Sequence, residues 1–90
     1  MAASWWVYMV ETQSGRLYTG ITTDVARRFS EHCDRSASSK GAKFFRSDPA
    51  GKVVYQEPCE NRSTASRREA VIKKLSRKEK LLLLAAATGA

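Results

Sequence analysis

The chain has 90 residues, of which 42% are hydrophobic and 28% charged, and its net charge is +7. This composition is typical of one soluble globular domain and argues against a disordered or fibrous chain. The longest apolar run covers residues 81–87, far short of the roughly 20 residues that cross a bilayer. The first residues do not resemble a secretory leader. We therefore expect a cytoplasmic protein that does not associate with membranes.

The positive charge is concentrated in the last third of the chain. Residues 1–60 have eight Lys or Arg against seven Asp or Glu, whereas residues 61–90 have eight against two. A basic face of this kind attracts polyanions, and nucleic acid is the commonest polyanion in the cytoplasm. An ordinary solvated helix surface is the alternative interpretation.

The cysteines and the histidine give little support for a zinc site. Cys33 and Cys59 are the only two cysteines and lack CxxC spacing, and His32 is the only histidine. Structural zinc sites are built from several such ligands. We expect both cysteines to be buried as small hydrophobic residues.

The first part of the chain predicts a β-hairpin. Residues 5–10 combine aromatic and β-branched side chains without helical spacing, which predicts a strand in the middle of a sheet, covered on both faces. Turn residues at 13–15 and a second strand over residues 16–20 follow. With the loop centred near residue 13, Tyr8 and Tyr18 are expected to lie opposite each other on one face.

A helix is predicted over residues 25–33, with three possible N-cap side chains at residues 22–24. Positions 25, 29, 32 and 33 have the spacing of a buried stripe, and Arg28 stands one turn before His32 at its edge. Residues 34–40 are expected to form a loop, and a short helix is expected around Phe44 and Phe45.

The second half predicts one strand and two helices. A third strand over residues 52–57 is expected to end at Pro58, followed by a helix capped by Asn61 or Ser63 that continues through Leu75. A capping box at residues 76–79 starts the last helix. The expected fold is α/β (α+β): a single domain over residues 1–90, with a three-stranded antiparallel or mixed sheet flanked by helices in the order β-β-α-(α)-β-α-α.

Two short stretches, Trp6-Val7-Tyr8 and Tyr18-Thr19-Gly20, place their tyrosines ten residues apart. Together with Arg28, His32 and Glu69, their spacing resembles that of the GIY-YIG nuclease superfamily. The resemblance covers nearly the whole chain and is particularly strong to the small stand-alone bacterial members, which have stretches similar to residues 17–24 and 40–43.

The resemblance implies metal-dependent hydrolysis of phosphodiester bonds in DNA, single- or double-stranded. Glu69 would then bind one Mg²⁺ or Mn²⁺, cations that accept a single carboxylate and retain several waters. Arg28 would stabilise the charge on the attacked phosphate. Tyr8 would activate the water with His32 relaying the proton, and Tyr18 would orient the water or the phosphate. Each of these residues also has an ordinary structural interpretation. Tyr8 and Tyr18 would be packing aromatics and His32 a core histidine. Arg28 would be a solvated helix residue, and Glu69 would be the helical ion-pair partner of Lys73.

Some positions depart from the family pattern. Trp6 stands where the first signature has glycine, Thr19 replaces isoleucine, and no Asn follows Glu69. A nucleic-acid-binding module with weak or lost catalysis is therefore an alternative, and a protein-interaction domain that uses residues 81–87 is a third. No obligatory protein partner is expected. The residues expected to contact DNA are Lys40, Lys43, Arg67, Arg68, Lys73, Lys74, Arg77 and Lys78.

Overall fold

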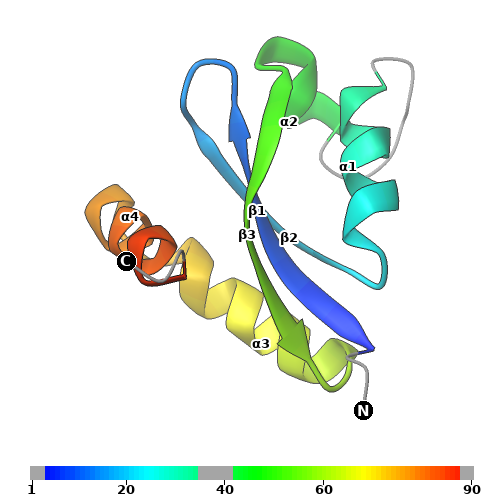
Figure 1. Ribbon diagram of the computed structural model, residues 1–90, viewed down its shortest axis with the longest axis vertical. Coiled ribbons are helices and arrows are strands. Elements are labelled where there is room, and N and C mark those ends of the chain that lie inside the picture. Colours follow the sequence, from blue (N-terminus) through cyan, green and yellow to red (C-terminus); the bar gives the residue numbers. More distant parts are fainter. Residues whose placement is uncertain (1–3, 35–41, 88–90) are drawn as a thin grey trace.

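Strands and helices follow one another in the predicted order in the computed structural model, which describes residues 4–34 and 42–87 (Figure 1). The predicted fold class is confirmed. The elements are β1 (Trp5–Thr12), β2 (Leu17–Thr22), α1 (Val25–Cys33), α2 (Ala42–Ser47), β3 (Ala50–Cys59), α3 (Arg62–Lys73) and α4 (Arg77–Ala87). The loop expected over residues 34–40 lies almost entirely outside the described residues.

The three strands form one antiparallel sheet with the order β2-β1-β3, so β1 is central, as predicted. The hairpin register differs from the expected one: Tyr8 lies opposite Gly20, and Tyr18 lies opposite Val10. The centre of the turn is one residue later than expected because Gly15 adopts a φ of 92° within it. A shift of the centre by one residue moves each partner by two, so Tyr8 and Tyr18 remain on the same face.

The third strand is longer than predicted and continues through Pro58, which pairs with Trp6. Proline is tolerated here because β3 is an edge strand, where the missing N–H faces away from the sheet. The following helix begins after the Asn61 cap, as expected, but ends at Lys73 rather than Leu75.

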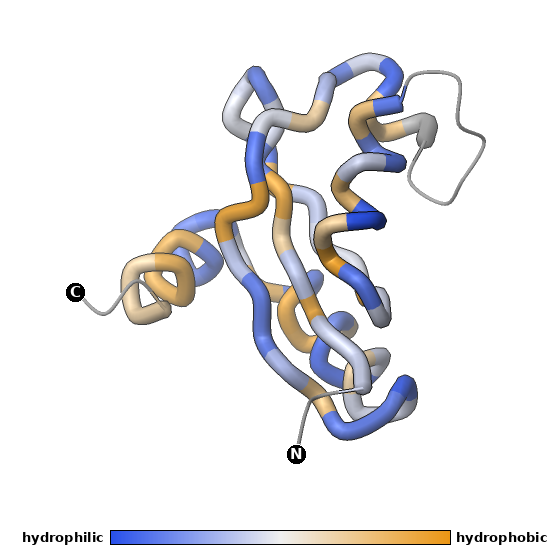
Figure 2. Tube along the Cα trace, turned by 45° about the vertical axis from the view of Figure 1, so that its right-hand side comes forward, coloured by the Kyte–Doolittle hydropathy of each residue, from blue (hydrophilic) through white to orange (hydrophobic). Residues whose placement is uncertain are grey.

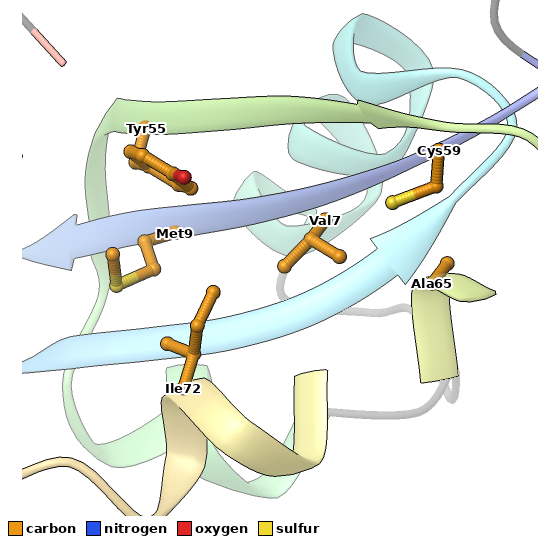
Figure 3. Packing of buried hydrophobic residues seen from close by; sticks show 6 residues of the cluster. All are labelled: Val7, Met9, Tyr55, Cys59, Ala65 and Ile72. Carbon is orange, nitrogen blue, oxygen red and sulfur yellow. The ribbon is translucent and has the colours of Figure 1, made fainter. Parts of the chain in front are cut away.

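Successive side chains of β1 point to opposite faces of the sheet, so the hydrophobic core is divided between the two faces. On one face, side chains of β1, β3 and α3 point toward one another (Figure 3); they are Val7, Met9, Tyr55, Cys59, Ala65 and Ile72. On the other face, Tyr8 and Val10 pack with Phe45 of α2, and Phe29 of α1 lies against them. Cys59 is buried as expected, whereas Cys33 is exposed at the end of α1, so that expectation was wrong.

Polar side chains fix the ends of the elements that surround this core. Asp24 caps α1 by accepting from the Arg27 N–H, and Ser76 and Glu79 form the predicted capping box of α4. Asp48 accepts from hydroxyls of the β1–β2 turn, including a 2.7 Å bond from Thr12 Oγ1.

Leucine and alanine give α4 a hydrophobic stretch in its later turns (Figure 2). Leu81 and Leu82 are 44% and 63% exposed, while Leu83 and Leu84 pack against the core. In the described part of the chain, this helix and the others lack the combination of length and apolarity that would let them span a membrane.

Candidate active site

A cleft of about 310 Å³ opens at the edge strand β2, between α1 and α3. Its lining includes residues from both faces of the sheet, because the cleft extends around the strand edge. Four of the five predicted catalytic residues line it, from four different elements: Tyr8, Tyr18, Arg28 and Glu69. The fifth, His32, lies behind Tyr8 and is buried.

Tyr8 is held in the floor of the cleft from two sides. Its side chain is 1% exposed, and its hydroxyl is 2.7 Å from His32 Nε2, within hydrogen-bond distance. The phenol lies directly over Gly20, where an added Cβ would be 2.7 Å from the Tyr8 oxygen and 2.9 Å from Cζ. The glycine of the second signature is therefore required by the position of the first tyrosine.

The buried surroundings of these groups keep them neutral. Burial raises the pKa of the Tyr8 phenol, and the nearby Tyr18 adds to this effect, while the charge and hydrogen bond of Arg28 oppose it. Burial, together with the charge of Arg28, lowers the pKa of His32 to about 4. At neutral pH the phenol is therefore protonated and the imidazole can accept a proton. Among the described residues, His32 Nδ1 has no hydrogen-bond partner.

Arg28 is bound in the wall of the cleft rather than solvated. Its side chain is 15% exposed and donates to Glu31 Oε1 at 2.9 Å. A hydrogen bond to Tyr8 contributes to the pKa of that phenol. The alternative interpretation of Arg28 as an ordinary exposed helix residue is therefore wrong. An anionic phosphate in the cleft would compete with Glu31 for the guanidinium.

Glu69 reaches the cleft from α3, on the opposite side from Arg28. Its side chain is 14% exposed, and Oε2 is 3.3 Å from Lys73 Nζ, the predicted helical partner. The described residues contain no group of three His, Cys, Asp or Glu that could hold a metal ion by themselves. One carboxylate in an open cleft does fit Mg²⁺ or Mn²⁺, which take their remaining ligands from water and phosphate.

The cleft is also lined by three charged residues that the sequence analysis did not propose as site residues, namely Arg27, Glu31 and Arg62. Arg62 begins α3 and lies over the Trp5 ring, 5.9 Å from its centroid. Helical spacing could have indicated Arg62, since it lies seven residues before Glu69 and thus on the same face of α3. Arg27 gave no such signal, because a rotation of about 100° separates it from Arg28.

The residues predicted to contact DNA are not all equally available. Lys40 lies outside the described residues, as does the side chain of Lys43. Arg68 binds both carboxylate oxygens of Glu57 and so connects α3 to β3, and Lys73 is paired with Glu69. Lys73 is nevertheless exposed, as are Arg67, Lys74, Arg77 and Lys78. Their contact with DNA stays a prediction.

Comparisons with known proteins bear directly on this arrangement. Residues 4–81 match the family model described as the GIY-YIG catalytic domain. The chain belongs to the GIY-YIG family. The match extends over every residue that lines the cleft. Membership of this family implies nuclease chemistry in general.

Small bacterial proteins of similar length share this GIY-YIG domain. The chain is 48% identical to the UPF0213 protein DP2720 of Desulfotalea psychrophila over 92% of this chain and 73% of the relative. It is 40% identical to the UPF0213 protein YhbQ of Escherichia coli over 94% of this chain and 81% of the relative. The solution NMR structure of the UPF0213 protein BH0048 from Bacillus halodurans has a TM-score of 0.56 at 30% identity, covering 91% of this chain and 83% of that one.

Proposed function

We propose that this protein is a divalent-metal-dependent DNA endonuclease that hydrolyses phosphodiester bonds in the cleft beside β2, with a role in DNA repair, recombination or uptake. The observation that supports this most strongly is the convergence of Tyr8, Arg28 and Glu69, from β1, α1 and α3, on one cleft. A phenol, a guanidinium and a carboxylate at one cleft are suited to proton transfer, phosphate binding and metal binding.

Arg28 binds the scissile phosphate in this proposal. Its planar guanidinium can donate two parallel hydrogen bonds to phosphate oxygens. The partly buried position strengthens this interaction, because the charge is less screened there than in bulk water. When water attacks phosphorus, negative charge grows on these oxygens, so the same contact stabilises the transition state more than the ground state.

Tyr8 and His32 move the proton of the attacking water. Because the Tyr8 phenol is protonated, it accepts a proton from water only as it gives its own to His32 Nε2, 2.7 Å away. This transfer is unfavourable in the free protein, because the pKa of His32 is only about 4 while that of the Tyr8 phenol is raised. A phosphate bound to Arg28 offsets the positive charge that contributes to this low pKa, so substrate binding raises the basicity of His32.

Glu69 is the residue that would hold the cation. A bound divalent cation supplies polarisation of the phosphate and neutralises charge on the leaving oxygen. Lys73 Nζ, 3.3 Å from Glu69 Oε2, holds the carboxylate in position in the absence of the cation.

The test is incubation with labelled single- and double-stranded DNA in Mg²⁺, in Mn²⁺ and in chelator. We expect cleavage with either metal, none in chelator, and none with Glu69→Ala, which should bind DNA as well as or better than wild type because a negative charge has been removed. Glu60→Ala is the matched control, since Glu60 is exposed and lies outside the cleft lining. Cleavage by Glu69→Ala at the wild-type rate would refute the assignment.

The absence of an Asn after Glu69 favours a second candidate function, a DNA-binding module with weak or lost catalysis. The same experiment separates the two candidates. Binding of DNA without cleavage in either metal supports the second candidate, and metal-dependent cleavage supports the first.

A further inference from the structure

A second, smaller cavity lies at the other end of β2 from the centre of the cleft. It has a volume of about 230 Å³, and its lining residues come from the hairpin, α2 and α4: Arg16, Leu17, Phe44, Arg77 and Lys80. Leu17 begins β2, whereas Gly20, under the Tyr8 phenol, lines the cleft. The two residues are three positions apart along the strand, or about 10 Å.

The charge of this cavity is positive. Three of its lining residues are cations, and Arg16 is stacked over the Phe44 ring, 4.5 Å from the centroid, which restricts the guanidinium to one region of space. Asp48 is the opposing charge, at 3.9 Å from Arg16 Nη1. Its carboxylate already accepts hydrogen bonds from the hairpin hydroxyls, so the three cations of the cavity outnumber one carboxylate that is largely engaged elsewhere.

The cavity adjoins the cleft through a pair of aromatic rings. Tyr18 lines the cleft, Phe44 lines the cavity, and the two rings are in contact with centroids 5.2 Å apart. On the other side of β2, α3 leads from the end of the sheet near the chain's N-terminus toward α4 (Figure 1). Lys73, which is paired with Glu69, ends α3 four residues before Arg77 begins α4.

We propose that the cavity is a phosphate subsite that binds the DNA strand on one side of the bond cut in the cleft. This inference rests on the proposed function and adds a direction to it: the substrate strand follows the β2 edge from Tyr8 to Arg16. The separation of about 10 Å equals about three rises of 3.4 Å along the axis of a duplex, and fewer steps along an extended single strand. The small volume and the three cations suit a phosphate group rather than a large apolar ligand.

The test compares two double variants that remove the same charge. Arg16→Gln with Lys80→Gln removes two cations of the cavity while keeping most of each side-chain stem. Arg46→Gln with Lys52→Gln removes two exposed cations that do not line the cavity or the cleft. Affinity for single-stranded DNA oligonucleotides, lengthened one nucleotide at a time from a trinucleotide, is measured by fluorescence anisotropy in chelator, so that binding is observed without cleavage.

We expect wild type and the control variant to gain affinity when the oligonucleotide becomes long enough to reach the cavity, and the cavity variant to lose this gain. For long oligonucleotides, the log–log slope of affinity against salt should become shallower by about 0.7 in the cavity variant, since the cavity binds one phosphate and each phosphate contact on single-stranded DNA contributes about 0.7. In Mg²⁺, cleavage of the shortest substrates should be unchanged, while longer substrates should require higher concentrations of the cavity variant.

Two results would overturn the subsite. One is an equal loss in both double variants, which would make the effect one of net charge. The other is a length-dependent gain that the cavity variant retains. Failure of the proposed function is distinguishable, because the length-dependent binding would then persist in chelator while no variant, nor the wild type, cleaves DNA in Mg²⁺ or Mn²⁺.

Discussion

Replacing Gly20 with alanine tests whether the position of the Tyr8 phenol matters for catalysis. The added Cβ would be 2.7 Å from the Tyr8 oxygen, and ordinary van der Waals contact begins at 3.4 Å. The phenol must therefore move by about 0.7 Å, in a core where Tyr8 is 1% exposed. Such a shift breaks or lengthens the 2.7 Å hydrogen bond to His32 Nε2.

The expected magnitudes follow from this displacement. Overpacking of a filled core costs about 1–3 kcal/mol of unfolding free energy. A misplacement of about 1 Å in an active site costs about 100-fold in rate, so we expect Gly20→Ala to lose about 10- to 100-fold in cleavage while remaining folded. Urea unfolding and single-turnover cleavage of labelled DNA measure the two effects separately.

Gly51→Ala is the matched control. Its Cβ would be 2.8 Å from the Glu11 carbonyl oxygen, a clash of the same size on the other edge strand, so it should lower stability without lowering the rate of the folded fraction. In a Tyr8→Phe background, Gly20→Ala should cost less stability than in wild type, because the oxygen it meets is gone. Wild-type cleavage by Gly20→Ala, or equal stability costs in the two backgrounds, would refute the reasoning.

Three other predictions concern charge and proton transfer. Arg28→Ala should lower the cleavage rate by about 10²–10³-fold, with partial rescue by Arg28→Lys and little change in the exposed Arg67→Ala; similar small losses in both alanine variants would contradict a specific role. The folded-state pKa of His32 is about 4, below its unfolded value. The unfolding free energy should therefore fall as the pH drops from about 6.5 to 4, by up to about 3 kcal/mol. Urea midpoints that change with pH equally in wild type and in His32→Gln would disprove this. DNA affinity should weaken steeply between about 50 and 200 mM salt. The slope of affinity against salt should flatten when the charges of Lys73, Lys74 and Lys78 are reversed together. An affinity that does not depend on salt would exclude an electrostatic interface.

The sequence by itself determined the local elements and the candidate catalytic residues. The apolar character of β1, the Asp24 and Asn61 caps and the capping box at Ser76 are encoded within a few residues of each element, so their existence and type could be predicted. The signature tyrosines and the spacing to Arg28 pointed to the family, because catalytic side chains are held at fixed positions on these same elements.

Tertiary packing decided what local patterns do not encode. The register of the hairpin depended on one positive φ at Gly15, and Pro58 could stay in β3 only because that strand lies at the edge of the sheet. Arg28 is partly buried, and Arg62 joins the cleft, because α1 and α3 pack on opposite faces of the sheet and the cleft extends around its β2 edge. These contacts join residues far apart in the chain, and their geometry follows from how the helices pack on the twisted sheet rather than from the spacing within any one segment.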